Sequence, residues 1–250
     1  IKLSLLPLFP ILVVMAYFIS KKNVIRLVKS FLYGILMLLL LTLPLSAFPL
    51  TWTTNFLLAN GLGEIQNITT FAFNFWWVIF KPVILIGNPE TLFSFSEIRL
   101  FGSPQDNLTF LGISLFNYAI ALFVIALLPI VNLIIRAKDK VLQLENLVLV
   151  FSITALLIFL FLPRMHERYL YPLFPLLAIY SGLTERFLFH FITLSLYSFI
   201  NLYIVWHPMK LPVLTYELIS NANFQWLIAL VTVITGVVLY IKSIRILNRA

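Results

Sequence analysis

The stretch VLQLENLVLVFSITALLIFLFL at residues 141–162, followed by PRMHERYLYP at residues 163–172, decides the fold class of this chain. A run of about 20 predominantly apolar residues is long enough to cross the roughly 30 Å hydrocarbon core of a bilayer. The first segment meets that requirement, and the second places several ionisable side chains at its end. Ionisable groups beside a membrane segment cost free energy and mark a functional site with a partner.

Comparable apolar runs recur along the chain. Its mean hydropathy is +1.04, with 62% hydrophobic and 10% charged residues, whereas about half of a soluble domain is apolar. We predict an all-α fold, a polytopic transmembrane helical bundle forming one domain over residues 1–250. Because the chain begins with Ile1, we expect it to be the C-terminal part of a longer protein. About seven spans are predicted, at residues 3–20, 30–50, 111–135, 141–162, 169–185, 187–206 and 224–241.

Basic residues indicate how these spans are oriented. Cytoplasmic loops of membrane proteins are enriched in Lys and Arg. Eleven of the 17 basic residues follow the first, third, fifth and seventh predicted spans, which alternation places on one side. We therefore attribute the net charge of +8 to membrane topology and expect no nucleic-acid partner. The eleven residues are Lys21, Lys22, Arg26, Lys29, Arg136, Lys138, Lys140, Arg186, Lys242, Arg245 and Arg249.

The same topology places residues 51–110 outside the cell as one extracytoplasmic loop region carrying interfacial helices. The region is far longer than an ordinary connection, and loops of that length usually have a function. Residues 71–82 read FAFNFWWVIFKP and are densely aromatic. Trp and Phe beside a Lys suit the headgroup region of a membrane. Two interpretations remain open, an interfacial helix that anchors the loop or one wall of a groove for a lipid substrate.

The corner at residues 163–172 has its own predicted geometry. Pro163 is favoured at the first position of a helix, and free backbone N–H groups at a helix start bind anions. Arg164 and Arg168 are four residues apart and would share one helix face, where a phosphate could bridge them. His166 adds a donor that can also transfer a proton near neutral pH. The alternative is an interface anchor in which Glu167 forms an internal salt bridge.

These residues also resemble a known family. The HERYLYP run at 166–172, preceded by LPRM at 162–165, resembles the late motif of bacterial polytopic glycosyltransferases of the GT-C fold. The AFNFWW run at 72–77 and Asp106 followed by LGIS at 111–114 are similar to theirs as well. The resemblance covers about residues 60–185. Members include mannosyltransferases and glucosyltransferases that use polyprenyl- or dolichyl-phosphate sugars.

The resemblance implies a function and a location. A polyprenyl-phosphate sugar donor would be held by its lipid tail in the membrane and by its phosphate at the outer rim. A hexose, mannose-like, would move to an acceptor glycan, lipid or protein on the extracytoplasmic face. The protein would be an integral, multi-pass component of the plasma membrane of a prokaryote, in contact with membrane lipids.

The candidate site residues follow from the motif. We expect Arg164, His166 and Arg168 to bind the donor phosphate, with Lys81 and Arg99 behind them and Trp76 and Trp77 lining the substrate site. His166 and Glu167 are the catalytic candidates within this chain. In the family the catalytic acid, often in an acidic pair, lies in the first outward loop.

No Asp-x-Asp pair occurs in this sequence, so we expect the catalytic base to lie upstream of Ile1. The three histidines are too far apart to form a metal site, and we expect neither metal nor cofactor.

Two other functions are compatible with the sequence. One is a transporter or flippase of a lipid-linked or anionic substrate, and the other is a non-catalytic membrane subunit that binds lipid phosphate. The charges lie at the ends of the predicted spans, whereas transport sites lie near the midplane between repeats. No inverted repeat is evident in the sequence, which favours the enzyme over the transporter.

Overall fold

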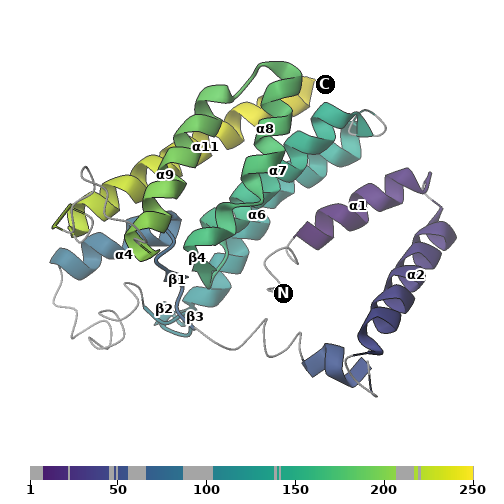
Figure 1. Ribbon diagram of the computed structural model, residues 1–250, viewed down its shortest axis with the longest axis horizontal. Coiled ribbons are helices and arrows are strands. Elements are labelled where there is room, and N and C mark those ends of the chain that lie inside the picture. Colours follow the sequence, from purple (N-terminus) through teal and green to yellow (C-terminus); the bar gives the residue numbers. More distant parts are fainter. Residues whose placement is uncertain are drawn as a thin grey trace.

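The computed structural model describes residues 8–21, 23–44, 48, 50–55, 66–86, 104–137, 140, 142–206, 217–218 and 221–249. Of residues 81–86 it describes the backbone only. The described part is mainly helical, and its long helices lie side by side in a bundle (Figure 1). Its main helices are α1 (Phe9–Ile19), α2 (Val24–Thr42), α4 (Phe75–Ile86), α6 (Leu115–Ala137), α7 (Leu144–Phe161), α8 (Leu173–Thr184), α9 (Leu188–Trp206) and α11 (Ala222–Arg249).

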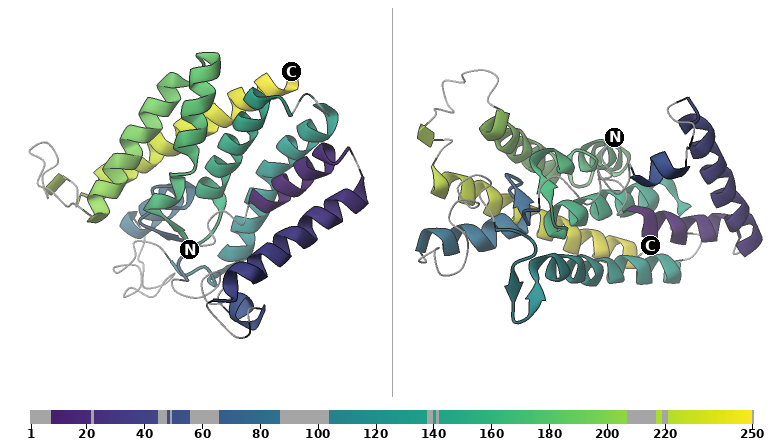
Figure 2. Two further views of the ribbon diagram at one scale, coloured as in Figure 1. Left: turned by 45° about the vertical axis from the view of Figure 1, so that its right-hand side comes forward. Right: turned by 90° about the horizontal axis from the view of Figure 1, so that it is seen from below.

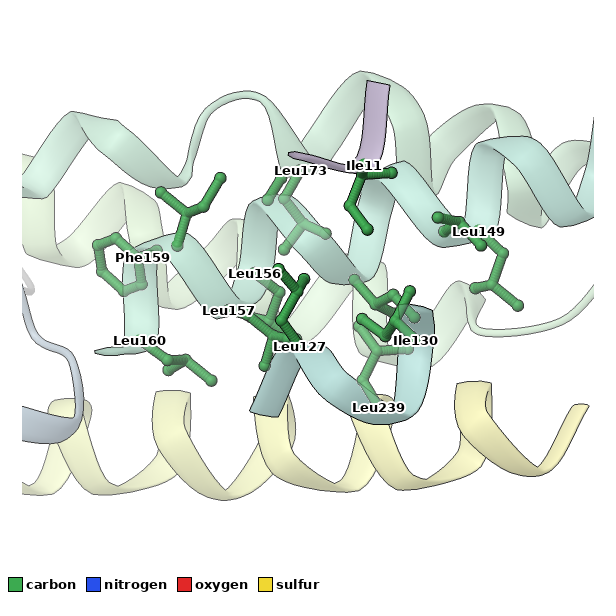
Figure 3. Packing of buried hydrophobic residues seen from close by; sticks show 14 of the residues in the cluster. Ile11, Leu127, Ile130, Leu149, Leu156, Leu157, Phe159, Leu160, Leu173 and Leu239 are labelled. Carbon is green, nitrogen blue, oxygen red and sulfur yellow. The ribbon is translucent and has the colours of Figure 1, made fainter. Parts of the chain in front are cut away.

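Helix α7 is the centre of the bundle. Thirteen of its 18 residues are buried, against α6, α8, α11 and α4. Figure 3 shows Leu156 and Leu157 of α7 beside Leu127 of α6, and Leu239 of α11 near Ile130 of α6. The buried hydroxyls of Ser152 and Thr154 each donate to a backbone carbonyl four residues earlier, at 2.8 and 2.7 Å. The helix therefore buries polar side chains without leaving these two hydroxyls unpaired.

Five of the described helices are long and apolar enough to cross a membrane, namely α2, α6, α7, α9 and α11. This fits an integral membrane protein, and a long apolar helix overlaps each of five of the seven predicted spans. The bounds predicted for the second span, 30–50, are wrong, because α2 already begins at Val24 and ends at Thr42, so that Arg26 and Lys29 belong to the helix. The other two predicted spans are not confirmed. The segment 3–20 is described from residue 8 and forms the 11-residue α1. The segment 169–185 forms the 12-residue α8, about 18 Å long at 1.5 Å per residue.

The helices alternate in direction, so their connections collect at two ends of the bundle. The α1–α2, α6–α7 and α8–α9 connections and the C-terminal end of α11 lie at one end (Figure 1). The described basic residues of the predicted cytoplasmic segments are therefore on one side. The opposite end holds the start of α6, the ends of α7 and α9 and all four short strands.

Helix α2 differs from α7 in its surroundings. Its only buried residue is Thr42, and its apolar side chains are exposed along most of its length. It lies at the outer edge of the molecule next to α1, with the rings of Phe9 and Phe31 5.6 Å apart (Figure 1). An apolar helix with so little protein contact is suited to a lipid environment.

Two small sheets interrupt the all-α architecture. Strand β1 (Thr69–Thr70) pairs in parallel with β4 (Met165–His166), and β2 (Thr109–Phe110) pairs antiparallel with β3 (Ile113–Ser114). Both lie at the end of the bundle away from the basic connections (Figure 1). The β1–β4 pairing joins a segment of the predicted loop 51–110 to the corner. Residues 56–65 and 87–103 of that loop lie outside the described residues.

Candidate functional site

The corner after α7 is not the helix start that the sequence predicts, and the expectation that Pro163 opens a helix is wrong. Arg164 has a backbone φ of +60°, Met165–His166 form β4, and Glu167–Leu170 form a 3₁₀ helix, η4. Arg164 and Arg168 therefore do not share a face of one α-helix. The predicted row of free N–H groups is also missing at Arg164, whose N–H donates to the carbonyl of Ile68 at 2.9 Å.

A long-range strand pairing is the reason for this difference. Thr69 is the register partner of Met165, and Thr70 is the partner of His166. These ladder hydrogen bonds hold the chain extended at the position where a helix would otherwise begin. Helix α8 starts only at Leu173, with Pro172 as its N-cap. Pro175 is then its third residue, where the backbone N–H of a helix has no intrahelical partner and proline loses no hydrogen bond.

Asn74 and Trp76 connect the aromatic segment to the end of α7. The Asn74 side-chain oxygen accepts from the N–H groups of Trp76 and Trp77 at 3.1 and 3.4 Å, which caps α4. The Asn74 amide also donates to Phe159 O at 3.0 Å, and the Trp76 indole donates to Phe161 O at 2.8 Å. Two carbonyls of the last turn of α7 are thus satisfied, as a buried helix end requires.

Asn201 of α9 fixes the same segment from the other side. Its side-chain oxygen accepts from Phe73 N at 3.1 Å, and its amide donates to Phe71 O at 2.7 Å. Asn201 is buried, and Phe71 has a backbone φ of +50°. Strained backbone conformations at Phe71 and Arg164 therefore lie at the two ends of the β1–β4 segment. Such conformations persist only where the surroundings determine them, and they often cluster at functional sites.

Arg164 is held by a buried carboxylate. Its Nε lies 2.6 Å from Oδ2 of Asp106, whose side chain is only 3% exposed. The Arg164 guanidinium also lies over the Phe116 ring, 5.4 Å from its centroid. Asp106 is fixed in turn, since its N–H donates to Gln66 O at 2.7 Å and its carbonyl accepts from Phe116 N at 2.8 Å.

Glu167 lies at the centre of the other half of the corner. Its side chain is 3% exposed, and Oε1 accepts from the Trp206 indole at 3.0 Å and from Arg168 at 3.4 Å. Nδ1 of His166 is 3.8 Å from Oε2. Burial alone would raise the pKa of Glu167, but His166, Trp206, its own backbone and the charge of Arg168 together lower it from 4.5 to about 2. The carboxylate is therefore ionised at neutral pH and is a poor proton acceptor.

Arg168 is the most accessible basic group of the motif. Its side chain is 37% exposed, against 23% for Arg164, which is paired with Asp106, and 14% for His166. The His166 ring packs edge-on against Tyr169 at 5.3 Å. With His166 neutral, the two arginines and two carboxylates of the corner sum to zero charge. A phosphate bound here would therefore need a protonated His166 or further cations.

The remaining predicted site residues have different positions. Trp76 and Trp77 are 4% and 1% exposed, so their indoles support the site from inside the bundle. Lys81 belongs to α4, but its side chain is outside the described part of the structure. Arg99 lies outside the described residues altogether. In the described part no group of three His, Asp or Glu side chains could hold a metal ion.

No protein-family model, curated protein or solved structure matches this chain. The resemblance to GT-C glycosyltransferases therefore stays a prediction.

Three residues of the corner escaped sequence reasoning. Asp106 was noted only for its motif, and its ion pair with Arg164 bridges 58 positions. Trp206 lies at the end of a predicted span, and nothing in the sequence pairs it with Glu167. Thr70 is buried, and its hydroxyl has no hydrogen-bond partner. A short polar sequence, NITT at residues 67–70, was the only available signal for Thr70.

Proposed function

We propose that this chain is part of a membrane glycosyltransferase of the GT-C type that takes a hexose from a polyprenyl-phosphate sugar. The supporting observation is the arrangement of Arg168, His166 and Glu167 at one end of an apolar helix bundle. An accessible guanidinium and an imidazole flank a buried, ionised carboxylate there. A lipid phosphate presents its charge at that depth of a membrane, with its tail among apolar helices.

Arg168 is the proposed contact for the donor phosphate. A guanidinium binds phosphate with two parallel hydrogen bonds. Its present partner, Glu167 Oε1, is 3.4 Å away and also accepts from Trp206. An incoming phosphate can therefore take over part of the Arg168 fork without leaving Glu167 unpaired.

His166 is the proposed donor to the departing phosphate. When sugar transfer breaks the bond to the phosphate oxygen, negative charge develops on that oxygen, and a nearby donor stabilises it. Glu167 lies beside the His166 ring and the Arg168 guanidinium and would keep both in place. It would not transfer a proton near neutral pH, because its pKa is about 2. We therefore assign Glu167 an orienting role, which sharpens its place among the catalytic candidates.

Thr70 adds a neutral group to the same site. It is the parallel register partner of His166, and residues directly opposite one another in a sheet project to the same face. Its buried hydroxyl has no partner, so a phosphate oxygen or the imidazole would satisfy it. Lys81 and Arg99 are the proposed additional cations that would offset the second negative charge, which develops on the polyprenyl phosphate when the sugar leaves it.

Binding and transfer should separate in this chain. Because it contains no paired carboxylates of the Asp-x-Asp kind, we expect the 250 residues to bind donor without transferring sugar. The test is the affinity of the purified, reconstituted chain for a short-chain polyprenyl phosphate, compared with the matching polyprenol. Stronger binding of the phosphate supports a donor site. Equal binding of the two would contradict it, and movement of the labelled lipid between leaflets would favour a flippase instead.

The proposed orientation places the corner outside the cytoplasm, in the plasma membrane. Since the chain has no cysteine, single introduced cysteines can be labelled without background. Asn23→Cys and Asn248→Cys should react only with reagent on the cytoplasmic side, and Asn107→Cys only from outside. Labelling of Asn23→Cys and Asn107→Cys from the same side would contradict this orientation.

A further inference from the structure

The β2–β3 hairpin carries an apolar tip outside the site described above. Phe110, Leu111 and Ile113 are 63%, 83% and 46% exposed. The hairpin projects from the side of the bundle beside the start of α6 (Figure 2, right). Three such positions within four residues are unusual on a surface that meets water, where exposed apolar residues occur singly or in functional patches.

Leu111, in the turn of the hairpin, has a strained backbone conformation. Leu111 and Gly112 have φ angles of +52° and +78°, the signs required by a two-residue type I′ turn. Asn-Gly is the preferred pair for this turn, because a branched side chain at the first position is strained. Leu111 is fully outside the protein core, so packing within this chain does not account for the strain.

The position of the hairpin indicates which medium covers it. Strand β3 runs directly into α6, which is long and apolar enough to span a membrane and exposes apolar side chains such as Ile120 and Val124. Tyr118 in the first turns of α6 ties the hairpin down, because its hydroxyl donates to Phe110 O at 3.1 Å. Tyrosine is enriched where membrane helices meet the headgroup region. Exposed apolar side chains of α6 thus begin within its second turn, close in the chain to the apolar tip.

We propose that the β2–β3 hairpin inserts its tip into the leaflet that surrounds the start of α6, where it binds the boundary between headgroups and acyl chains. Apolar residues at an interface are buried about 5–10 Å below the headgroups. Phe110 and Leu111 occupy that layer, while the polar base at Asn107 and Thr109 stays among the headgroups. The hairpin thereby fixes the depth of the neighbouring Arg164–Asp106 pair relative to the membrane surface.

The test uses a single cysteine at Leu111, labelled with the environment-sensitive dye NBD in the full chain. The protein is reconstituted in phosphatidylcholine vesicles that contain lipids with a nitroxide at acyl carbon 5 or carbon 12. We expect a blue-shifted emission and stronger quenching by the carbon-5 nitroxide than by the carbon-12 nitroxide. The matched control is Asn107→Cys, an exposed position at the polar base, which should be quenched mainly by aqueous iodide.

A second variant separates insertion from folding. Leu111→Asn suits the left-handed backbone and removes the apolar tip, so it should preserve or raise thermal stability in detergent. In vesicles, NBD at Phe110→Cys should lose much of its nitroxide quenching when Leu111→Asn is added. Equal iodide quenching at Leu111→Cys and Asn107→Cys, or unchanged nitroxide quenching with Leu111→Asn, would overturn the proposal.

Discussion

Arg164 and Arg168 lie four residues apart in one motif, yet the structure gives them different surroundings. Arg164 has its Nε 2.6 Å from a carboxylate that is 3% exposed, and its backbone is in the left-handed region. Arg168 is 37% exposed and lies 3.4 Å from Glu167. One motif can therefore combine two roles: Arg164 stabilises the corner, and Arg168 remains accessible to a ligand.

The largest expected effect is on stability at the Arg164 end. Arg164→Ala leaves the buried Asp106 carboxylate without its closest cation, and breaking a buried ion pair costs about 3–5 kcal/mol. The free energy of unfolding in detergent micelles measures this loss. Adding Asp106→Ala should recover part of it, because the unpaired charge is then gone. If Arg164→Ala had the unfolding free energy of wild type, the Arg164–Asp106 pair would not be the contact that stabilises the corner.

The stability contributed by Glu167, the partner of Arg168, should depend on pH. Folding lowers the pKa of Glu167 from 4.5 to about 2, so its stabilising contribution is complete above pH 4.5 and is lost as the pH falls toward 2. A shift of that size corresponds to about 3 kcal/mol of unfolding free energy. Unfolding curves of wild type and Glu167→Gln should converge over this range. A constant difference between them down to pH 2 would contradict the buried, ionised state.

Removing one donor to Glu167 should have a smaller effect. Trp206→Phe keeps the aromatic ring and removes the indole N–H that donates to Oε1 at 3.0 Å. Hydrogen bonds to charged groups are worth about 1.5–3 kcal/mol, and we expect about 1 kcal/mol here because Trp206 is half exposed to its surroundings. The loss should disappear in a Glu167→Ala background, where no acceptor for the indole remains, and a fully additive pair would argue against this contact.

The smallest expected effect on stability is at Arg168. Glu167 is as buried as Asp106, but its contact with the partly exposed Arg168 is long, at 3.4 Å, and Trp206 still donates to the same oxygen when Arg168 is removed. Ion pairs of this kind contribute about 0–1 kcal/mol, so Arg168→Ala should unfold within about 0.5 kcal/mol of wild type. Thermal unfolding in the same micelles measures this together with Arg164→Ala. If Arg168→Ala lowered the unfolding free energy as much as Arg164→Ala, both arginines would have a structural role.

The sequence predicts the membrane class because long apolar runs have few alternatives to a helix in lipid. It does not distinguish α7 from α2, whose apolar windows have mean hydropathies of 2.3 and 2.1. Helix α7 is the buried centre of the bundle, whereas α2 is almost wholly exposed. Hydropathy measures the transfer of a side chain out of water, and in a membrane both protein and lipid provide that environment.

The candidate site shows a similar limit. The polar residues at 163–168 could be identified because they are conspicuous among apolar neighbours. The backbone conformation of these residues could not be predicted, because the pairing of Thr69–Thr70 with Met165–His166 overrides the local preference of Pro163 for a helix start. The partner of Arg164 was equally hidden, because Asp106 lies in a separate segment of the chain.

The central claim is that Arg168 binds the phosphate of a lipid-linked donor. Its most direct test is the affinity for short-chain polyprenyl phosphate, measured on equal amounts of folded wild type, Arg168→Ala and Arg168→Lys. We expect Arg168→Ala to weaken binding by about ten- to a hundredfold, the loss of one charge-assisted contact.

Arg168→Lys should restore only part of the affinity, because an ammonium group cannot reproduce the two-pronged guanidinium contact. Affinity for the uncharged polyprenol should be the same in all three proteins. Wild-type affinity of folded Arg168→Ala for polyprenyl phosphate would contradict the claim.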